Sequence, residues 1–280
     1  MKRQFVMLAI VTLLVSHVAI QNASAADSLI EYEKLLVPFS FTYIPGAYGS
    51  IWTMSFTVTN PLDVGVLAYP NFGPPSGSHP GLEPPCCVPA PLIPRTTYRP
   101  VILGDLKGRG VFFFVDKRYV DQIQMTLRLQ DISREAETWG TVIPVVRSRE
   151  FVDRAVSLND IPVNSRFRVT IRVYSFDGTL PATVAVTAYG TIAEETNPAD
   201  VLLESRTFAL SYDPSLFPDG VSYSPGFLQI PSLASLASFA GYSRARIDIK
   251  PTSPDTRIWA FASVTNNETQ HVTVIVPSTQ

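Results

Sequence analysis

The chain has 280 residues, 46% of them hydrophobic and 16% charged, which is enough to bury two cores of ordinary domain size. Its formal net charge of −2 argues against general nucleic-acid binding, which needs a strong basic excess. The 24 prolines and 15 glycines, together with 11% aromatic residues, are typical of a folded, turn-rich chain and exclude a disordered one.

The first 26 residues show the three-part pattern of a secretory signal peptide. Lys2 and Arg3 begin it, an apolar run covers residues 5–15, and small residues precede a cleavage site after Ala25 or Ala26. The alternative is an uncleaved membrane anchor, but a full span needs about 20 apolar residues. We therefore predict an exported protein, secreted or periplasmic, with no membrane span after cleavage.

The first half of the mature chain predicts short β-strands separated by turns. Residues 34–41 form the first predicted strand, at a sheet edge because of Pro38. Residues 51–60 alternate between apolar and polar, so one side faces a core and the other faces water. We predict that residues 64–69 are the hairpin partner of that strand.

Three further strands are predicted after a long loop, over residues 101–103, 111–115 and 122–130. Residues 111–115 are apolar on both faces, so one face needs a cover from the loop or from a neighbouring domain. Residues 122–130 alternate, with their even-numbered positions mostly polar.

The loop, residues 70–100, is rich in proline and unusually long for a compact domain, which is typical of functional or mobile segments. It contains the only cysteines, Cys86 and Cys87, and also His79. The two cysteines allow several states: a strained disulfide between these adjacent residues, an intermolecular disulfide to another chain, or free thiols. We predict a redox or staple pair, because two thiols and one histidine are a poor zinc site.

The second half alternates even more clearly. Residues 166–174 place Phe167, Val169, Ile171 and Val173 on one side, and residues 182–192 and 244–250 follow the same pattern. Residues 154–158, 201–210 and 222–230 are further predicted strands, and residues 257–264 and 272–276 form a closing hairpin. Residues 232–240 have a helical period with Ser232 as N-cap.

About seven short strands per half predict an all-β protein with two tandem immunoglobulin-like antiparallel β-sandwiches. The predicted division is a signal peptide over residues 1–26, an N-terminal sandwich over residues 27–142, and a C-terminal sandwich over residues 143–280. The predicted boundary between the two sandwiches lies within residues 139–151, between two strand-like patterns.

Three groups of residues also carry a resemblance: PGAYGSIW (45–52) with TNP (59–61), DISR (131–134) with WG (139–140) and IPVVR (143–147), and WAF (259–261) with VTNNETQ (264–270). On these residues the chain resembles uncharacterised secreted bacterial proteins with tandem immunoglobulin-like domains. The resemblance covers most of the mature chain and implies an envelope, surface or secreted role. It implies no catalytic motif.

The residues themselves also predict a protein that is not an enzyme. After signal cleavage only His79 and His271 remain, and no Gly-x-Ser-x-Gly elbow, EF-hand loop or phosphate-binding glycine loop is present. Scattered acidic residues in the second half leave a carboxylate pair open, because sequence cannot show the separation of two carboxyl groups. We assign no catalytic residue, metal ligand or cofactor.

The best candidate binding surface is basic. Alternation puts cations and a tyrosine on the predicted outward sides of two strands, and in an immunoglobulin-like order these strands are neighbours in one sheet. The candidate face comprises Arg166, Arg168, Arg172, Tyr174, Arg244, Arg246 and Lys250. Such a face suits an anionic polysaccharide or a carboxylate-rich protein; the alternative is a solvated face with weak ion pairs.

We therefore expect a non-enzymatic interaction or structural module of the cell envelope or secretome, with an unidentified protein or polysaccharide partner at the cell surface. The alternative is a carbohydrate-binding or carbohydrate-active protein. An exposed aromatic platform would favour that alternative. We instead expect the three tryptophans in a core or at the boundary between the sandwiches: Trp52, Trp139 and Trp259.

Overall fold

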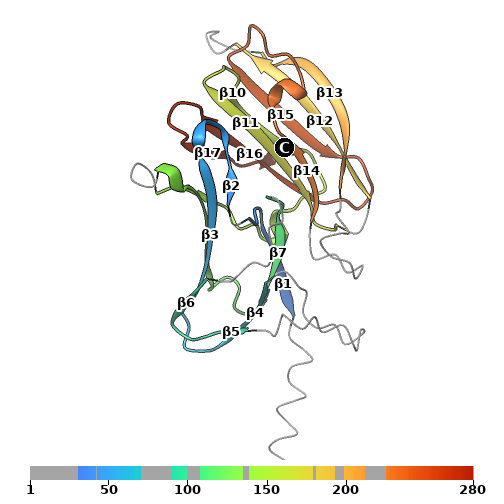
Figure 1. Ribbon diagram of the computed structural model, residues 1–280. Helices are drawn as coiled ribbons and strands as arrows, with labels where there is room; N and C mark the ends of the chain where they lie inside the picture. The colour runs from blue at the N-terminus through green and yellow to red at the C-terminus, as the bar shows by residue number, and fades with distance from the viewer. Residues whose placement is uncertain are drawn as a thin grey trace, which may run out of the picture.

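The computed structural model describes residues 31–41, 43–70, 90–99, 108–134, 139–178, 181–192, 199–211 and 225–279 (Figure 1). Within these ranges the regular structure is β-strands and short 3₁₀ helices. The strands form four antiparallel sheets, an all-β arrangement compatible with β-sandwich packing. The predicted signal peptide and the predicted strand over residues 101–103 lie outside the described residues.

Two sheets come from the first half of the chain and occupy the lower part of Figure 1. The β7 sheet has the order β1 (Tyr32–Val37), β7 (Val111–Asp116), β4 (Val66–Pro70), β5 (Ala90–Leu92). The β3 sheet has the order β2 (Ile44–Pro45), β3 (Ile51–Asn60), β8 (Gln124–Asp131), β9 (Thr141–Ile143), and β6 (Thr96–Tyr98) also pairs with β3.

The other two sheets come from the second half. The β15 sheet has the order β13 (Val201–Leu210), β12 (Ala182–Thr191), β15 (Arg244–Pro251), β10 (Val156–Pro162), β18 (Ser278–Thr279). The β11 sheet has the order β14 (Gly226–Ile230), β11 (Phe167–Ser175), β16 (Ile258–Asn266), β17 (Val272–Ile275). The described 3₁₀ helices are η2 (Ala47–Gly49), η3 (Ile132–Arg134), η4 (Ser148–Glu150) and η6 (Leu233–Ser235).

Alternation predicted the inward residues of the second half well. Val169, Ile171 and Val173 of β11 are buried in the same apolar cluster as Ile247 and Ile249 of β15. The closing hairpin is confirmed by the antiparallel pairing of β16 with β17. The predicted helical connector is a single 3₁₀ turn, η6, and the Ser232 hydroxyl accepts a hydrogen bond from the Ala234 amide at 3.2 Å.

The prediction of a hairpin between residues 51–60 and 64–69 is wrong. β4 pairs with β7 and β5, whereas β3 pairs with β8. The buried Asn60 explains the crossing, because its Nδ2 donates to the Val64 carbonyl at 2.7 Å and to the Leu92 carbonyl at 2.9 Å. These bonds hold the turn that leads the chain from one sheet into the other.

The two halves share one apolar cluster. Tyr174 and Phe261 of the β11 sheet are buried with Leu36, Phe39 and Phe112 of the first half. The inner face of the β11 sheet already covers the β15 sheet, so the β11 sheet is buried on both faces. We call this contact between its outer face and the first half the joint.

The joint also covers the second apolar face of β7. The Phe113 ring packs against Phe56 at 5.4 Å, within the first half. The neighbouring Phe112 ring faces the later residues Phe151, at 6.4 Å, and Phe176, at 5.9 Å. The second apolar face of β7 is therefore covered in part by Phe151 and Phe176, which follow the two sheets of the first half in sequence.

Residues 139–151 run along this joint. β9 pairs with β8, then Val146 bridges to Leu36 of β1, and Val152 bridges to Ile258 of β16. Arg147 in this segment forms a bidentate ion pair with Glu33 of β1. Its Nε donates to Oε1 and its Nη2 donates to Oε2, both at 2.6 Å. That pairing with Arg147 lowers the pKa of the Glu33 carboxyl.

Replacement of Tyr174 by Phe tests the joint. The buried Tyr174 hydroxyl donates to the Pro38 carbonyl at 2.6 Å, and its loss leaves that carbonyl without this donor. We expect the free energy of unfolding to fall by about 1–3 kcal/mol, measured by urea denaturation. The control is Tyr43→Phe, whose side chain is 62% exposed, with an expected change within about 0.5 kcal/mol. Equal effects of the two substitutions would contradict the role of this bond.

Candidate functional site

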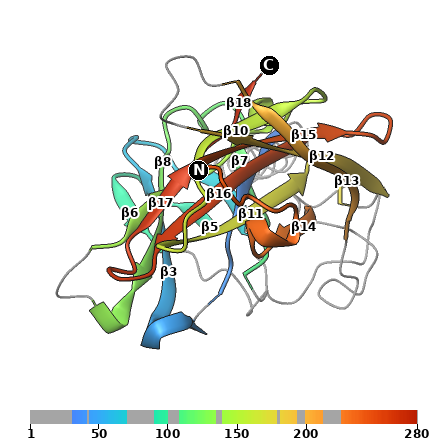
Figure 2. The same ribbon diagram turned by 90° about the horizontal axis from the view of Figure 1, so that it is seen from above.

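An open groove of about 720 Å³ lies between Trp139 and the β16–β17 hairpin. We call it the Trp139 groove. Its lining combines aromatic, aliphatic, amide, hydroxyl and imidazole side chains: Trp139, Phe167, Val264, Asn266, Thr269, His271 and Thr273. Figure 2 shows the β16–β17 hairpin that forms one wall, and Thr141 Oγ1, which donates to the Val272 carbonyl at 2.6 Å, ties it to the first half.

Trp139 is the most unexpected residue of this groove. Its side chain is 69% exposed, although we expected it in a core or at the boundary between the two sandwiches. The Arg128 guanidinium lies 5.8 Å from the indole ring. Arg128 and Gln130 also donate to the Trp139 carbonyl, at 3.4 and 3.2 Å, so the backbone of Trp139 is held against β8 while its ring faces solvent.

Gly140 allows this arrangement. Its φ of +84° lies in the left-handed region, which residues with a Cβ rarely adopt. A Cβ at this position would also lie far inside contact distance of the Leu129 carbonyl oxygen. The Trp-Gly pair thus turns the chain tightly over β8 and directs the indole outward.

The opposite wall is a turn held by its own side chains. The Asn266 Oδ1 accepts hydrogen bonds from the amides of Glu268, at 2.8 Å, and Thr269, at 3.1 Å. Gln270 is buried, with a φ of 57°, and its Nε2 donates to the Asn267 carbonyl at 2.6 Å. Thr269 and His271 on this preformed turn and Thr273 on β17 are exposed, so their polar groups line the groove without a need for reorganisation.

A second exposed aromatic residue meets the same turn from the first half. Tyr48 in η2 is 66% exposed, and the Arg168 guanidinium lies 5.2 Å from its ring. Arg168 also donates to Asn267 Oδ1 at 2.7 Å and to Gln270 Oε1 at 2.8 Å. Arg168 therefore holds η2 and the β16–β17 turn together.

The predicted basic face is not one surface. β11 and β15 belong to different sheets, so the prediction that they are neighbours in one sheet is wrong. The outward side of β11 is instead the joint. Tyr174 is fully buried there, and the Arg172 guanidinium lies 4.6 Å from the Phe39 ring and 5.9 Å from the Phe261 ring. Burial lowers the pKa of Arg172 and raises that of Tyr174.

The remaining predicted cations are mostly paired. Arg166 lies 3.6 Å from Glu268, and Arg244 lies 2.8 Å from Asp160, both at exposed positions. Arg246 forms ion pairs with Asp248, at 3.1 Å, and with Asp200, and it also lies over the Tyr189 ring. Lys250 is exposed at the end of β15. Anion binding by these residues stays a prediction.

The other predicted pair, Cys86 and Cys87, lies outside the described residues, as does His79. Among the residues that the structure describes, no three His, Cys, Asp or Glu side chains gather as metal ligands would. The same residues contain no helix long and apolar enough to cross a bilayer. Comparisons of the chain with protein-family models, curated proteins and solved structures give no match.

Lys34 is a further charged group that alternation did not single out. Its Nζ donates to the Phe176 carbonyl at 2.6 Å and lies over the rings of Phe112, at 4.2 Å, and Phe176, at 3.9 Å. Burial lowers the Lys34 pKa to about 8, against its ordinary value of 10.5; the nearby Asp177 opposes this shift and Arg257 adds to it.

The lowered pKa makes the free energy of unfolding depend on pH. Below about pH 8, Lys34 is charged in both states, and the folded state bears the cost of a buried cation. Between about pH 8 and 10.5 only the unfolded state keeps the proton, so the Lys34 contribution becomes more stabilising as pH rises. Relative to Lys34→Met, the wild type should gain up to about 3 kcal/mol across this window. Denaturant unfolding at several pH values measures it, with the exposed Lys250→Met as control; a pH-independent difference would contradict the assignment.

Gly140→Ala tests how Trp139 is positioned. The substitution combines a left-handed φ with a clash against the Leu129 carbonyl, so we expect a loss of about 2–4 kcal/mol in unfolding free energy. Gly49→Ala is the matched control, because Gly49 has a φ of +74° but no atom near its would-be Cβ. It should lose only about 1–2 kcal/mol. Thermal or urea unfolding measures both variants. A loss for Gly140→Ala that is no larger than the loss for Gly49→Ala would contradict the close approach of Gly140 to the Leu129 carbonyl.

Proposed function

We propose that this protein is a non-enzymatic, exported interaction module of the cell envelope or secretome, and that its ligand is a glycan bound in the Trp139 groove. The signal-peptide pattern of residues 1–26 supports export. The four antiparallel sheets are compatible with two tandem immunoglobulin-like sandwiches over residues 27–142 and 143–280. The resemblance to secreted bacterial proteins agrees with this architecture.

The observation that carries the glycan proposal is the exposed indole of Trp139 at the edge of an open groove. Tryptophan is enriched at interfaces because it offers a large apolar ring and an N–H donor, and ligand sites are concave and lined by aromatic side chains. A sugar ring has an apolar face of C–H groups that stacks on an indole. Its hydroxyls would meet the amide, hydroxyl and imidazole groups of Asn266, Thr269 and His271 on the opposite wall.

The groove suits an extended polymer more than a small substrate. It is open, and its polar groups lie on one wall while the indole lies on the other. Tyr48 adds a second exposed ring on the same side of the joint, next to the same turn. Two aromatic rings beside one polar turn offer successive contacts along a chain of sugars.

Binding to an array of cell-envelope polysaccharides tests the proposal, followed by titration of any ligand found. Trp139→Ala should weaken binding by more than about tenfold, because a central aromatic contact is typically worth about 2 kcal/mol or more. Tyr98→Ala is the control: Tyr98 is 42% exposed on β6, which lies at the opposite end of β3 from β17 (Figure 1), and its loss should leave the affinity unchanged.

The fluorescence of Trp139 gives an independent readout. A bound sugar should protect this exposed indole from acrylamide quenching, and Trp139→Phe should remove the ligand-dependent change. Trp259 is buried and Trp52 is partly buried, and both lie outside the groove lining, so they give a background that the ligand leaves unchanged. Binding that survives Trp139→Ala unchanged, or an array without any polysaccharide signal, would overturn the glycan proposal. Salt-resistant capture of a protein instead of a polysaccharide would support a protein-binding module.

A further inference from the structure

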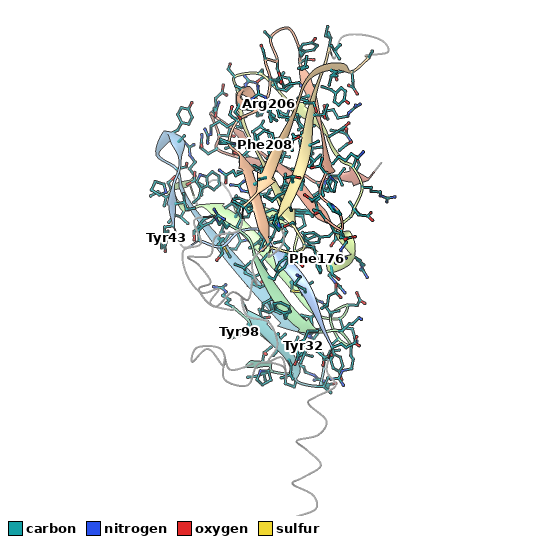
Figure 3. The ribbon with its side chains drawn as sticks, turned by 90° about the vertical axis from the view of Figure 1, so that its right-hand side faces the viewer. Tyr32, Tyr43, Tyr98, Phe176, Arg206 and Phe208 are labelled. Carbon is teal, nitrogen blue, oxygen red and sulfur yellow. The ribbon has the colours of Figure 1, made fainter. Side chains whose placement is uncertain are left out.

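β13 is the outermost strand of the β15 sheet, and its only strand partner among the described residues is β12 (Figure 2). It is ten residues long, and most of its side chains are exposed. Val201 and Leu202 are 45% and 59% exposed. Arg206 and Phe208 lie on the side of the molecule that faces the viewer in Figure 3.

A long exposed edge strand presents backbone N–H and C=O groups that can pair with another strand. Proteins protect such edges with prolines, charged side chains, short strands, bulges or covering segments. β13 contains neither proline nor lysine, and its two charged residues, Glu204 and Arg206, have opposite signs. A register shift near Leu203 interrupts its pairing with β12, but residues Glu204 to Leu210 pair with β12 without interruption. Within the described ranges, the backbone of this regular part pairs with β12 alone, so its other side can accept a second strand.

The charges on this part of β13 are complementary to themselves. Glu204 and Arg206 stand opposite Ala188 and Val186 of β12, so both project from the same face of the sheet. They are half-exposed and lie 3.4 Å apart, with Ser205 between them in sequence. Glu204 and Arg206 therefore lie symmetrically about Ser205. If β13 of a second copy runs antiparallel to this strand, the negative residue of each copy can stand opposite the positive residue of the other.

We infer that β13 pairs with β13 of a second copy of this chain, antiparallel, with Ser205 opposite Ser205. In this register, Glu204 of each copy stands opposite Arg206 of the other. Opposite charges across an antiparallel pair stabilise it, whereas like charges destabilise it. A shift of the centre by one residue puts Glu204 opposite Glu204 or Arg206 opposite Arg206, as does an in-register parallel pairing.

The surroundings of β13 are consistent with this register. Ser205 projects to the other face of the sheet, where its hydroxyl contacts that of Thr187 at 3.0 Å. Arg206 Nη1 donates to the Ser235 carbonyl at 3.1 Å, which positions the guanidinium along the strand. The inference is independent of the Trp139 groove, which is formed by other elements.

Sedimentation equilibrium of the purified protein over a range of concentrations tests the pairing. The wild type should show a reversible dimer. Glu204→Arg gives a strand with two cations, and Arg206→Glu gives one with two anions, so each variant alone should dimerise at least tenfold more weakly. The double variant Glu204→Arg/Arg206→Glu restores opposite charges in each pair and should recover the dimer.

A mixture of the two single variants separates pairing from misfolding. In the mixture, the two cations on β13 of one chain would face the two anions on β13 of the other, so a heterodimer should form although neither variant dimerises well alone. A monomeric wild type at all concentrations would overturn the inference. So would single variants that dimerise as strongly as the wild type, or a mixture that stays monomeric while circular dichroism shows both variants folded.

Discussion

The β11 sheet packs against other sheets on both of its faces, and this double burial organises the molecule. Its inner face packs on the β15 sheet through residues such as Val169 and Ile171. Its outer face packs through Tyr174, Trp259 and Phe261 on the first half. Because the apolar burial is continuous across the joint, the two halves hold each other through a core-like contact. Polar groups buried inside it need partners there, and among the described residues of the joint only the Arg172 Nε has none.

Those trapped polar groups explain the local details of the joint. The Tyr174 hydroxyl reaches the Pro38 carbonyl, Lys34 reaches the Phe176 carbonyl, and the Arg172 guanidinium packs against Phe39 and Phe261. Where the joint opens to solvent, the same sheet continues into the β16–β17 hairpin, which forms one wall of the Trp139 groove. The groove therefore takes its shape from both halves.

Local pattern predicted most of the strands, because apolar and polar side chains alternate along a half-buried strand whatever lies around it. The strand over residues 51–60, the inward side of β11 and the closing hairpin could all be recognised in this way. The pairing of residues 64–69 could not, because it depends on the buried Asn60 amide, whose partners are distant carbonyls. For Trp139, the preceding polar stretch and the following glycine were the available signals of an exposed turn.

The alternation along the chain is sufficient to infer an all-β protein, most of its strands and the apolar side of most of them. The surroundings of the polar sides depend on how the sheets pack together. The outward side of β11 carries arginines and a tyrosine, as a solvated strand would, yet it is covered. The apolar parts of these side chains pack against the first half, the Tyr174 hydroxyl donates to the Pro38 carbonyl, and Arg172 Nη1 donates to Ser263 Oγ. Likewise, Trp139 has the composition of a core residue, and only the close approach of Gly140 to β8 turns it outward.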